Sequence, residues 1–136
     1  RKDHEYFREL LSELDMGLEN RMKTKMGLLS GGQRQAASLL MSTIAQPKLL
    51  LLDEHTAALD PGAAEKVMAV TEKIVARDRI TTLMITHDMD YALSVGDRTN
   101  MLDSGRIVLD LKGEERKAMT SGKLAELFYT KQRPRR

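Results

Sequence analysis

The chain has 136 residues, of which 41% are hydrophobic and 31% charged, values typical of a globular protein rather than of a disordered or fibrous one. It carries 22 Lys and Arg against 20 Asp and Glu, so its net charge of +2 gives no reason to expect a nucleic-acid partner. The lack of cysteine excludes disulfides, thiol nucleophiles and thiolate metal sites. The chain opens Arg1-Lys2-Asp3 without an initiator Met, so we expect it to be a piece of a longer protein.

Apolar residues at helical spacing predict a first helix over about residues 3–14. A second helix is expected from Ser30 to about Ala45, since Pro47 forbids its continuation. Four leucines, 49–52, then stand between Pro47 and a carboxylate pair and show no helical period. They predict a short strand that is buried on both faces.

Asp60-Pro61 is a helix cap followed by a proline in the first turn, and it predicts a third helix to about Ala76. The β-branched and apolar residues 81–86 predict a second buried strand. Asp88 should cap a short helix that ends near Val95.

Ser104-Gly105 predicts a hairpin between strands at 99–103 and 106–110, and residues 121–129 predict a last amphipathic helix. The basic tail 131–136 is expected to be a solvated end. Strands that alternate with helices predict an α/β fold with a parallel sheet, whose ligands gather at the carboxyl ends of the strands.

Asp53 and Glu54 end the leucine strand. An Asp at such a position can hold Mg²⁺, and the adjacent Glu can activate a water that attacks a phosphate, because strand side chains alternate in direction. The alternative is that the two carboxylates only begin a loop.

Leu29-Ser30-Gly31-Gly32-Gln33 opens the second predicted helix. Two glycines let backbone amides approach an anion, and the partial charge of the helix N-terminus favours that anion. The alternative is a glycine turn capped by Ser30. His87, directly after the second strand, can bond a phosphate oxygen or have a purely structural role.

Four motifs in this order resemble the ATP-binding-cassette (ABC) ATPases over about residues 10–110. Residues 29–33 match the signature motif letter for letter, and residues 49–54 resemble the Walker B strand with its catalytic glutamate. Ala58-Leu59-Asp60 resembles the D-loop, and Thr86-His87-Asp88 resembles the switch-histidine segment. The resemblance implies a P-loop NTPase (RecA-like) parallel sheet flanked by helices, with part of the helical subdomain before it and the hairpin after it.

The resemblance also implies roles in a site shared by two subunits. Ser30, Gly31 and Gly32 would meet the γ-phosphate of an ATP held by a second ATP-binding subunit. Asp53 would support Mg²⁺, Glu54 would activate water, and His87 would contact the γ-phosphate in its own subunit. Gln33 would close the signature turn, and Asp60 would help to couple the two sites.

His55 and Ala58 depart from the pattern, because a proline and a serine are usual at these positions. The sequence also has no G-x-x-x-x-G-K-[ST] phosphate loop: Gly27 and Gly32 have the glycine spacing, but Gln33 and Arg34 follow. We therefore expect the chain alone to be inactive as an ATPase.

The resemblance divides the chain into three parts. Residues 1–45 would form the end of the helical subdomain with the signature helix, residues 46–130 the C-terminal half of the ATPase core, and residues 131–136 a basic tail. The function implied is the ATPase subunit of a bacterial importer, peripheral on the cytoplasmic face of the plasma membrane. Its expected partners are transmembrane permease subunits and a solute-binding protein. The alternatives are a non-transport ABC ATPase and a non-catalytic cassette that serves as an interaction module.

Overall fold

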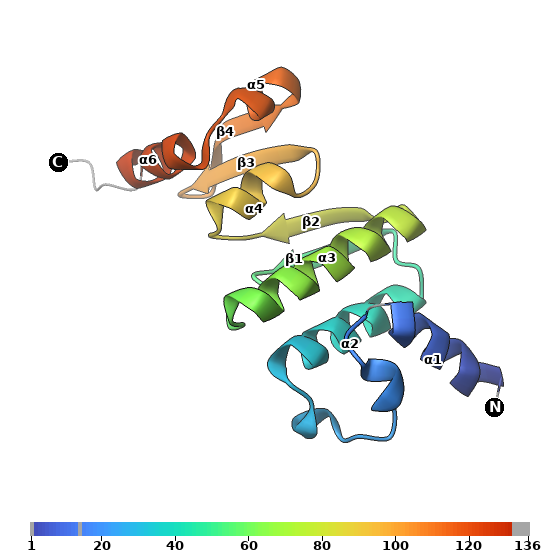
Figure 1. Cartoon of the computed structure of the whole chain (residues 1–136). Helices are drawn as coiled ribbons and strands as arrows, with labels where there is room; N and C mark the ends of the chain where they lie inside the picture. Colours follow the sequence, from blue (N-terminus) through green and yellow to red (C-terminus); the bar gives the residue numbers. More distant parts are fainter. Residues whose placement is uncertain (1, 14, 132–136) are drawn as a thin grey trace. The chain divides into compact units, whose positions relative to one another are not determined.

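The computed structural model describes residues 2–13 and 15–131, and the chain divides into two compact units, Arg1–Ile85 and Thr86–Arg136 (Figure 1). Tail residues 132–136 lie outside the described residues, as does residue 14, where the first predicted helix ends. The elements of the first unit are, in chain order, α1 (Lys2–Glu13), η1 (Leu18–Asn20), η2 (Met26–Leu28), α2 (Gly31–Ile44), β1 (Leu49–Asp53), α3 (Pro61–Asp78) and β2 (Thr81–Ile85).

The three helices predicted for this part of the chain are confirmed, and two of them begin at the predicted caps. Ser30 caps α2, and Asp60 caps α3, whose first helical residue is Pro61. Helix α3 ends at Asp78 and is capped by Arg79, a residue in the left-handed conformation with φ 49°. The cap side chains accept amide protons that the first helical turn leaves without intrahelical partners, which is why they mark helix starts.

Strands β1 and β2 pair in parallel, with Leu49 opposite Thr81 and Asp53 opposite Ile85. The connection between them is helix α3, as the alternation of strand and helix predicts. The parallel pairing is therefore confirmed, and both strands deliver their last residues to the same edge of the sheet (Figure 1).

The core of the first unit lies on one face of this small sheet. Leu50 and Leu52 are buried there against helices α2 and α3, together with Ala36, Leu39, Leu40, Val70 and Ile74. Leu49 and Leu51 point to the other face and are 52% and 64% exposed. The prediction that this strand is buried on both faces is thus wrong, because in the described residues α2 and α3 cover only one of them.

The prediction of a buried second strand is wrong for the same reason. Leu83 and Ile85 of β2 are 58% and 54% exposed, on the face that no described helix covers. Thr82 and Met84, which alternate with them, are half-buried. Side chains of a strand alternate between faces, so covering one face leaves every second residue in water.

The second unit consists of α4 (Met89–Ser94), β3 (Arg98–Asp103), β4 (Arg106–Lys112), α5 (Gly113–Ala118) and α6 (Ser121–Lys131). The predicted hairpin is confirmed: β3 and β4 are antiparallel and joined by Ser104 and Gly105. Both turn residues have positive φ angles, 50° and 76°, as a type I′ turn requires. The register shifts once, between Met101 and Leu102.

Helices α4 and α6 are also confirmed, whereas α5 was not predicted. The core of this unit centres on Met101, Leu111 and Leu124, with Leu127 and Phe128 of α6 packed against it. The chain is therefore a mixed α/β structure with a small parallel sheet and a separate hairpin. In the described residues, no helix combines the length and the apolar character needed to cross a membrane.

Candidate functional site

The signature turn is built on a reciprocal pair of hydrogen bonds. The Gln33 amide donates to Ser30 Oγ at 3.1 Å, and the Ser30 amide donates to Gln33 Oε1 at 3.1 Å. Gln33 Nε2 also donates to the Met16 carbonyl oxygen at 3.1 Å, which ties the turn to the segment before η1. This capping box fixes the start of α2 and leaves Ser30 exposed.

Gly31 and Gly32 stand where helix α2 approaches the segment that leads into α3. A β-carbon at Gly31 would lie 3.1 Å from Leu59 Cδ2, and one at Gly32 would lie 3.2 Å from Ala63 Cβ. Gly32 is buried, whereas Gly31 is half-buried. Gly32 therefore has a packing reason of its own, and the 29–33 turn lies beside Leu59 and Ala63 within the first unit.

Asp53 and Glu54 lie at the carboxyl end of β1. Asp53 is the last strand residue, opposite Ile85, and its side chain is exposed. The Glu54 amide extends the pairing by donating to the Ile85 carbonyl oxygen at 2.9 Å. Glu54 itself has a left-handed backbone, with φ 49°, and its Oε1 atom is buried. A non-glycine residue in that conformation is uncommon and is found preferentially at functional sites.

The segment after Glu54 turns sharply before it enters α3. The Ala57 amide donates to the Glu54 carbonyl oxygen and the Leu59 amide to that of Thr56, each at 3.1 Å. Asp60 then caps α3 by accepting the Ala63 amide at 3.0 Å. Carboxylates 53, 54 and 60 thus belong to one short, hydrogen-bonded connection.

The position of the Asp53 carboxylate is compatible with binding of a magnesium ion. Residues 2–13 and 15–131 include no cluster of three or more Asp, Glu or His side chains that could cage a metal. Mg²⁺, however, commonly keeps several waters and takes one or two carboxylates together with phosphate oxygens. An exposed carboxylate at the edge of a parallel sheet fits that requirement.

His87 belongs to the second unit, in a turn that leads into α4. The Asp88 amide donates to Thr86 Oγ1 at 3.0 Å, and Asp88 Oδ1 accepts the Tyr91 amide at 3.0 Å, which caps the helix. His87 lies between these two bonded residues, and its side chain is exposed. The bonds on either side therefore fix the backbone at His87, and the residue lies at the surface.

Arg116 of α5 holds the other end of α4, and sequence reasoning missed it. Its guanidinium donates to the Val95 carbonyl oxygen at 2.7 Å, the Gly96 carbonyl oxygen at 2.9 Å and Thr99 Oγ1 at 2.9 Å. A cation at a helix C-terminus also meets the negative end of the helix dipole favourably. The short helix that follows His87 is thus anchored at both ends.

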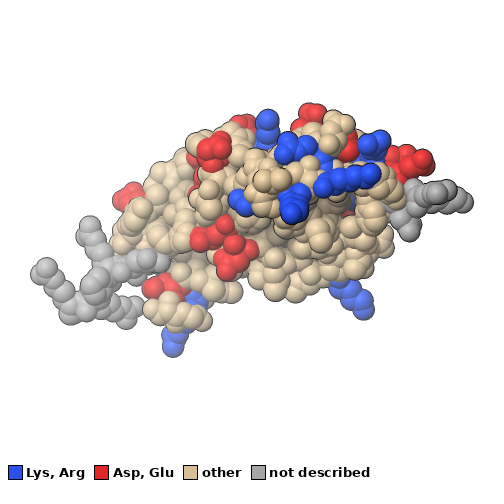
Figure 2. Space-filling model, turned by 90° about the horizontal axis from the view of Figure 1, so that it is seen from below, with Lys and Arg blue, Asp and Glu red and all other residues tan. Residues whose placement is uncertain are grey.

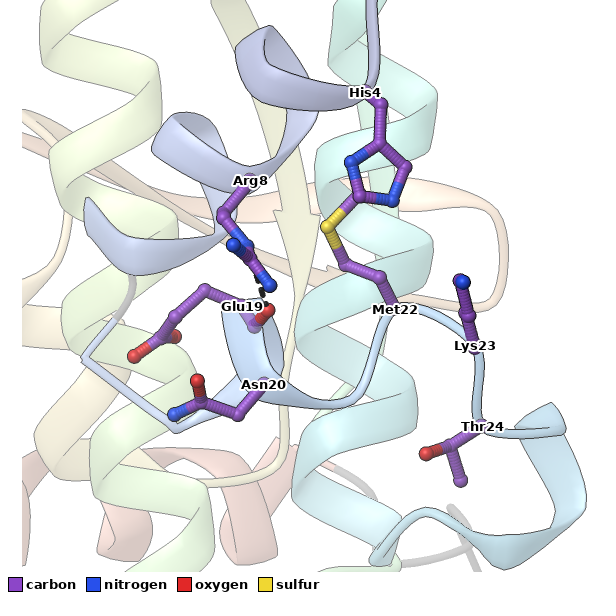
Figure 3. Close-up of a pocket in the computed structure, with 7 residues that line it drawn as sticks. All are labelled: His4, Arg8, Glu19, Asn20, Met22, Lys23 and Thr24. Atoms are coloured by element: carbon purple, nitrogen blue, oxygen red, sulfur yellow. Dashed lines mark hydrogen bonds between the residues drawn. The ribbon is translucent and has the colours of Figure 1, made fainter. Parts of the chain in front are cut away.

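A surface pocket of about 290 Å³ lies between α1 and the segment after it (Figure 3). Arg8 Nε there donates to the Glu19 carbonyl oxygen at 3.4 Å. The other lining residues are His4, Asn20, Met22, Lys23 and Thr24. None of the predicted site residues lines this pocket. On the face drawn in Figure 2, basic side chains gather with acidic ones around them, so charges of both signs lie together.

Comparison with known proteins matches residues 2–57 to the family model described as ABC transporter. A tyrosine transport ATP-binding protein of Clostridioides difficile (strain R20291) is 49% identical over 88% of this chain and 47% of its own length. An aliphatic sulfonates import ATP-binding protein of Rhodococcus jostii (strain RHA1) is 38% identical over 71% of this chain and 39% of its own.

A second aliphatic sulfonates import ATP-binding protein, from Agrobacterium fabrum (strain C58 / ATCC 33970), is 40% identical over 71% of this chain and 38% of its own length. The chain thus spans less than half the length of each of these relatives. The family model covers both the signature turn at 29–33 and the strand with its carboxylates at 49–54. On these matches, the chain belongs to the ATP-binding proteins of the ABC transporter family.

Proposed function

We propose that the protein containing this chain is the ATP-hydrolysing subunit of an ABC transporter, and that this transporter imports a small solute. The observation that carries the proposal is the strand end at Asp53 and Glu54, which a parallel pairing and a hydrogen-bonded turn hold at the sheet edge. Phosphoryl transfer depends on positioning and electrostatics more than on covalent chemistry by the protein, so a fixed pair of carboxylates is what it requires.

The proposed roles follow the motif positions. Asp53 supports Mg²⁺, which when bound neutralises charge on the phosphates. Glu54 accepts a proton from the attacking water, and His87 donates a hydrogen bond to the γ-phosphate. Gln33 keeps the signature turn closed and Asp60 couples the two sites of a dimer.

Ser30, Gly31 and Gly32 are proposed to meet the γ-phosphate of ATP held by a second ATP-binding subunit. The Ser30 hydroxyl oxygen accepts from Gln33, so its hydrogen is available to donate to a phosphate oxygen. The start of α2 adds favourable partial charge toward an anion. Nucleotide then joins two subunits, and hydrolysis releases them.

The remaining proposals concern the surroundings of the subunit. Residues 1–45 form the end of the helical subdomain, 46–130 belong to the ATPase core, and 131–136 are a tail. Transmembrane permease subunits and a solute-binding protein are the proposed partners, with the subunit peripheral on the cytoplasmic face of the plasma membrane. The relative named for tyrosine transport supports an amino-acid-like solute, and those named for aliphatic sulfonates import support uptake rather than export.

The experiment that tests this function is Glu54→Gln in the complete protein. The variant should keep ATP binding and lose about 10²–10⁴-fold in turnover, the usual contribution of one placed acid or base. Glu72→Gln, an exposed change on α3, is the matched control and should leave turnover unchanged. Unchanged turnover in Glu54→Gln would remove Glu54 from its role. A complete protein that neither binds nor hydrolyses ATP would favour the interaction module.

The 136-residue chain by itself is proposed to bind ATP weakly, since it carries no G-x-x-x-x-G-K-[ST] sequence. Calorimetry of this chain with Mg-ATP is the measurement. A dissociation constant in the micromolar range would contradict the proposal.

A further inference from the structure

The side chain that follows Glu54 is anchored on helix α3. His55 Nε2 lies 2.9 Å from Thr71 Oγ1, sixteen positions along the chain. Thr71 is 2% exposed, and His55 is half-buried. The imidazole therefore extends from the turn that follows Asp53 and Glu54 to the buried side of helix α3.

The direction of this hydrogen bond follows from what else Thr71 does. Thr71 Oγ1 donates its single hydrogen to the Val67 carbonyl oxygen at 2.8 Å. It can therefore only accept from His55, which must carry a proton on Nε2.

The residue just before this anchor has a costly backbone. Glu54 has φ 49°, a left-handed conformation that is strained for a non-glycine residue and persists only where its surroundings impose it. On one side, the Glu54 amide is held by the Ile85 carbonyl oxygen of β2. On the other, the next residue is held by Thr71 of α3. These two attachments bracket the strained residue.

We propose that His55 is a positioning residue, which through its hydrogen bond to Thr71 fixes the backbone of Glu54 and hence the direction of the Glu54 carboxylate. The inference rests on the proposed function for its catalytic consequence. Its geometric part, the Nε2–H bond to Thr71, stands independently of that function.

The geometric part is tested by ¹⁵N NMR of the complete protein labelled at histidine. The expected spectrum has a His55 signal that shows a proton on Nε2, unchanged in Thr71→Ser and altered in Thr71→Val. Thr71→Ser keeps the hydroxyl, and Thr71→Val replaces it by a methyl group of similar size. A His55 ring that carries its proton on Nδ1 in the unaltered protein would overturn the inference.

The catalytic part is tested by ATP turnover in the same variants. Thr71→Val should lower kcat about 10- to 100-fold with little change in KM for ATP, because small misplacements of a reacting group have effects of that size. Thr71→Ser should retain most of kcat. In a Glu54→Gln background, Thr71→Val should cause no further loss, since residues that act as one unit are not additive.

A second pair of variants covers the case in which Thr71→Val does not fold. His55→Gln places an amide N–H near the position of Nε2 and should retain most of kcat, whereas His55→Phe should lose as much as Thr71→Val. If Glu54→Gln abolishes turnover but neither His55→Phe nor Thr71→Val lowers kcat, the inference is wrong and the proposed function stands. If the tautomer is as expected but Glu54→Gln leaves turnover intact, the proposed function fails instead.

Discussion

Ser30 and Gln33 close the first turn of α2 on each other, each side chain accepting the other residue's amide proton at 3.1 Å. One serine hydroxyl therefore has two separable tasks: its oxygen caps the helix, and its hydrogen, on an exposed residue, is left for a further partner. The capping task belongs to this structure, and the second task, toward a phosphate, belongs to the proposed function.

Substitutions at Ser30 should separate these tasks. Ser30→Ala should destabilise the chain by about 1 kcal/mol, because it removes a helix cap. Ser30→Asn keeps a capping acceptor and should leave the free energy of unfolding nearly unchanged, as measured by denaturant titration. In the complete protein both variants should weaken ATP-dependent dimerisation. If Ser30→Asn dimerises with ATP as well as the unaltered protein does, the hydroxyl does not meet a phosphate.

Gly31 and Gly32 should differ in their tolerance of alanine. A β-carbon at Gly31 meets the flexible tip of Leu59, which can rotate away, so Gly31→Ala should have little effect on stability. A β-carbon at Gly32 meets Ala63 Cβ on the neighbouring helix, so Gly32→Ala should cost about 1–3 kcal/mol, as overpacking does. Thermal unfolding of the two variants side by side measures the difference, and equal midpoints would contradict the close approach of α2 and α3.

Leu51 and Leu52 are adjacent and identical in type, yet they should respond oppositely to truncation. Leu52 is 8% exposed and packs in the core, so Leu52→Ala should cost about 2–5 kcal/mol. Leu51 is 64% exposed, so Leu51→Ala should change the stability of the 136-residue chain by less than about 0.5 kcal/mol. Denaturant titration of both variants provides the comparison. A Leu51→Ala cost as large as that of Leu52→Ala would show that the second face is covered.

Asp110 should make the hairpin sensitive to acid. Hydrogen bonds from the Arg98 guanidinium, at 2.8 and 2.6 Å, hold the pKa of Asp110 below its ordinary value of 3.8. A carboxyl whose folded pKa is depressed stabilises the fold above its unfolded pKa, and the contribution disappears as the pH falls through the folded pKa.

The thermal midpoint should therefore fall on acidification below about pH 4, and less steeply in Asp110→Asn. The effect should be small, because the pair is exposed and water screens it. Glu126→Gln, on the exposed side of α6, is the control and should follow the unaltered chain. An Asp110→Asn profile as steep as that of the unaltered chain would assign the acid sensitivity to other groups.

Local chemistry explains which elements the sequence could predict. Ser30, Asp60 and Asp88 satisfy amides within three residues, and Ser104-Gly105 adopts a turn that needs only its own two residues, so the corresponding boundaries are correct. Helix α5 escaped prediction because it has six residues and none of them is buried. A helix that short has no apolar period to detect.

Exposure and long-range contacts could not be predicted in the same way. Whether Leu51 is buried depends on which elements pack on its face of the sheet. Four consecutive leucines carry no local signal that distinguishes a covered face from an exposed one. The contacts of His55 with Thr71 and of Arg116 with Val95 at the end of α4 join residues that are 16 and 21 positions apart. The roles assigned to Asp53, Glu54 and His87 remain predictions, and the Glu54→Gln variant tests that of Glu54.

The bare side of the β1–β2 sheet has a practical consequence for every measurement on the 136-residue chain. Four apolar side chains on this face are exposed to water: Leu49, Leu51, Leu83 and Ile85. Exposed apolar patches of this kind promote self-association. Two copies of the chain that associate through these side chains would form a dimer. That dimer would be mistaken for the ATP-dependent dimer that the proposed function predicts. Dimers seen with this chain should therefore be titrated with and without ATP at several protein concentrations, since leucine-driven association depends on concentration but not on nucleotide.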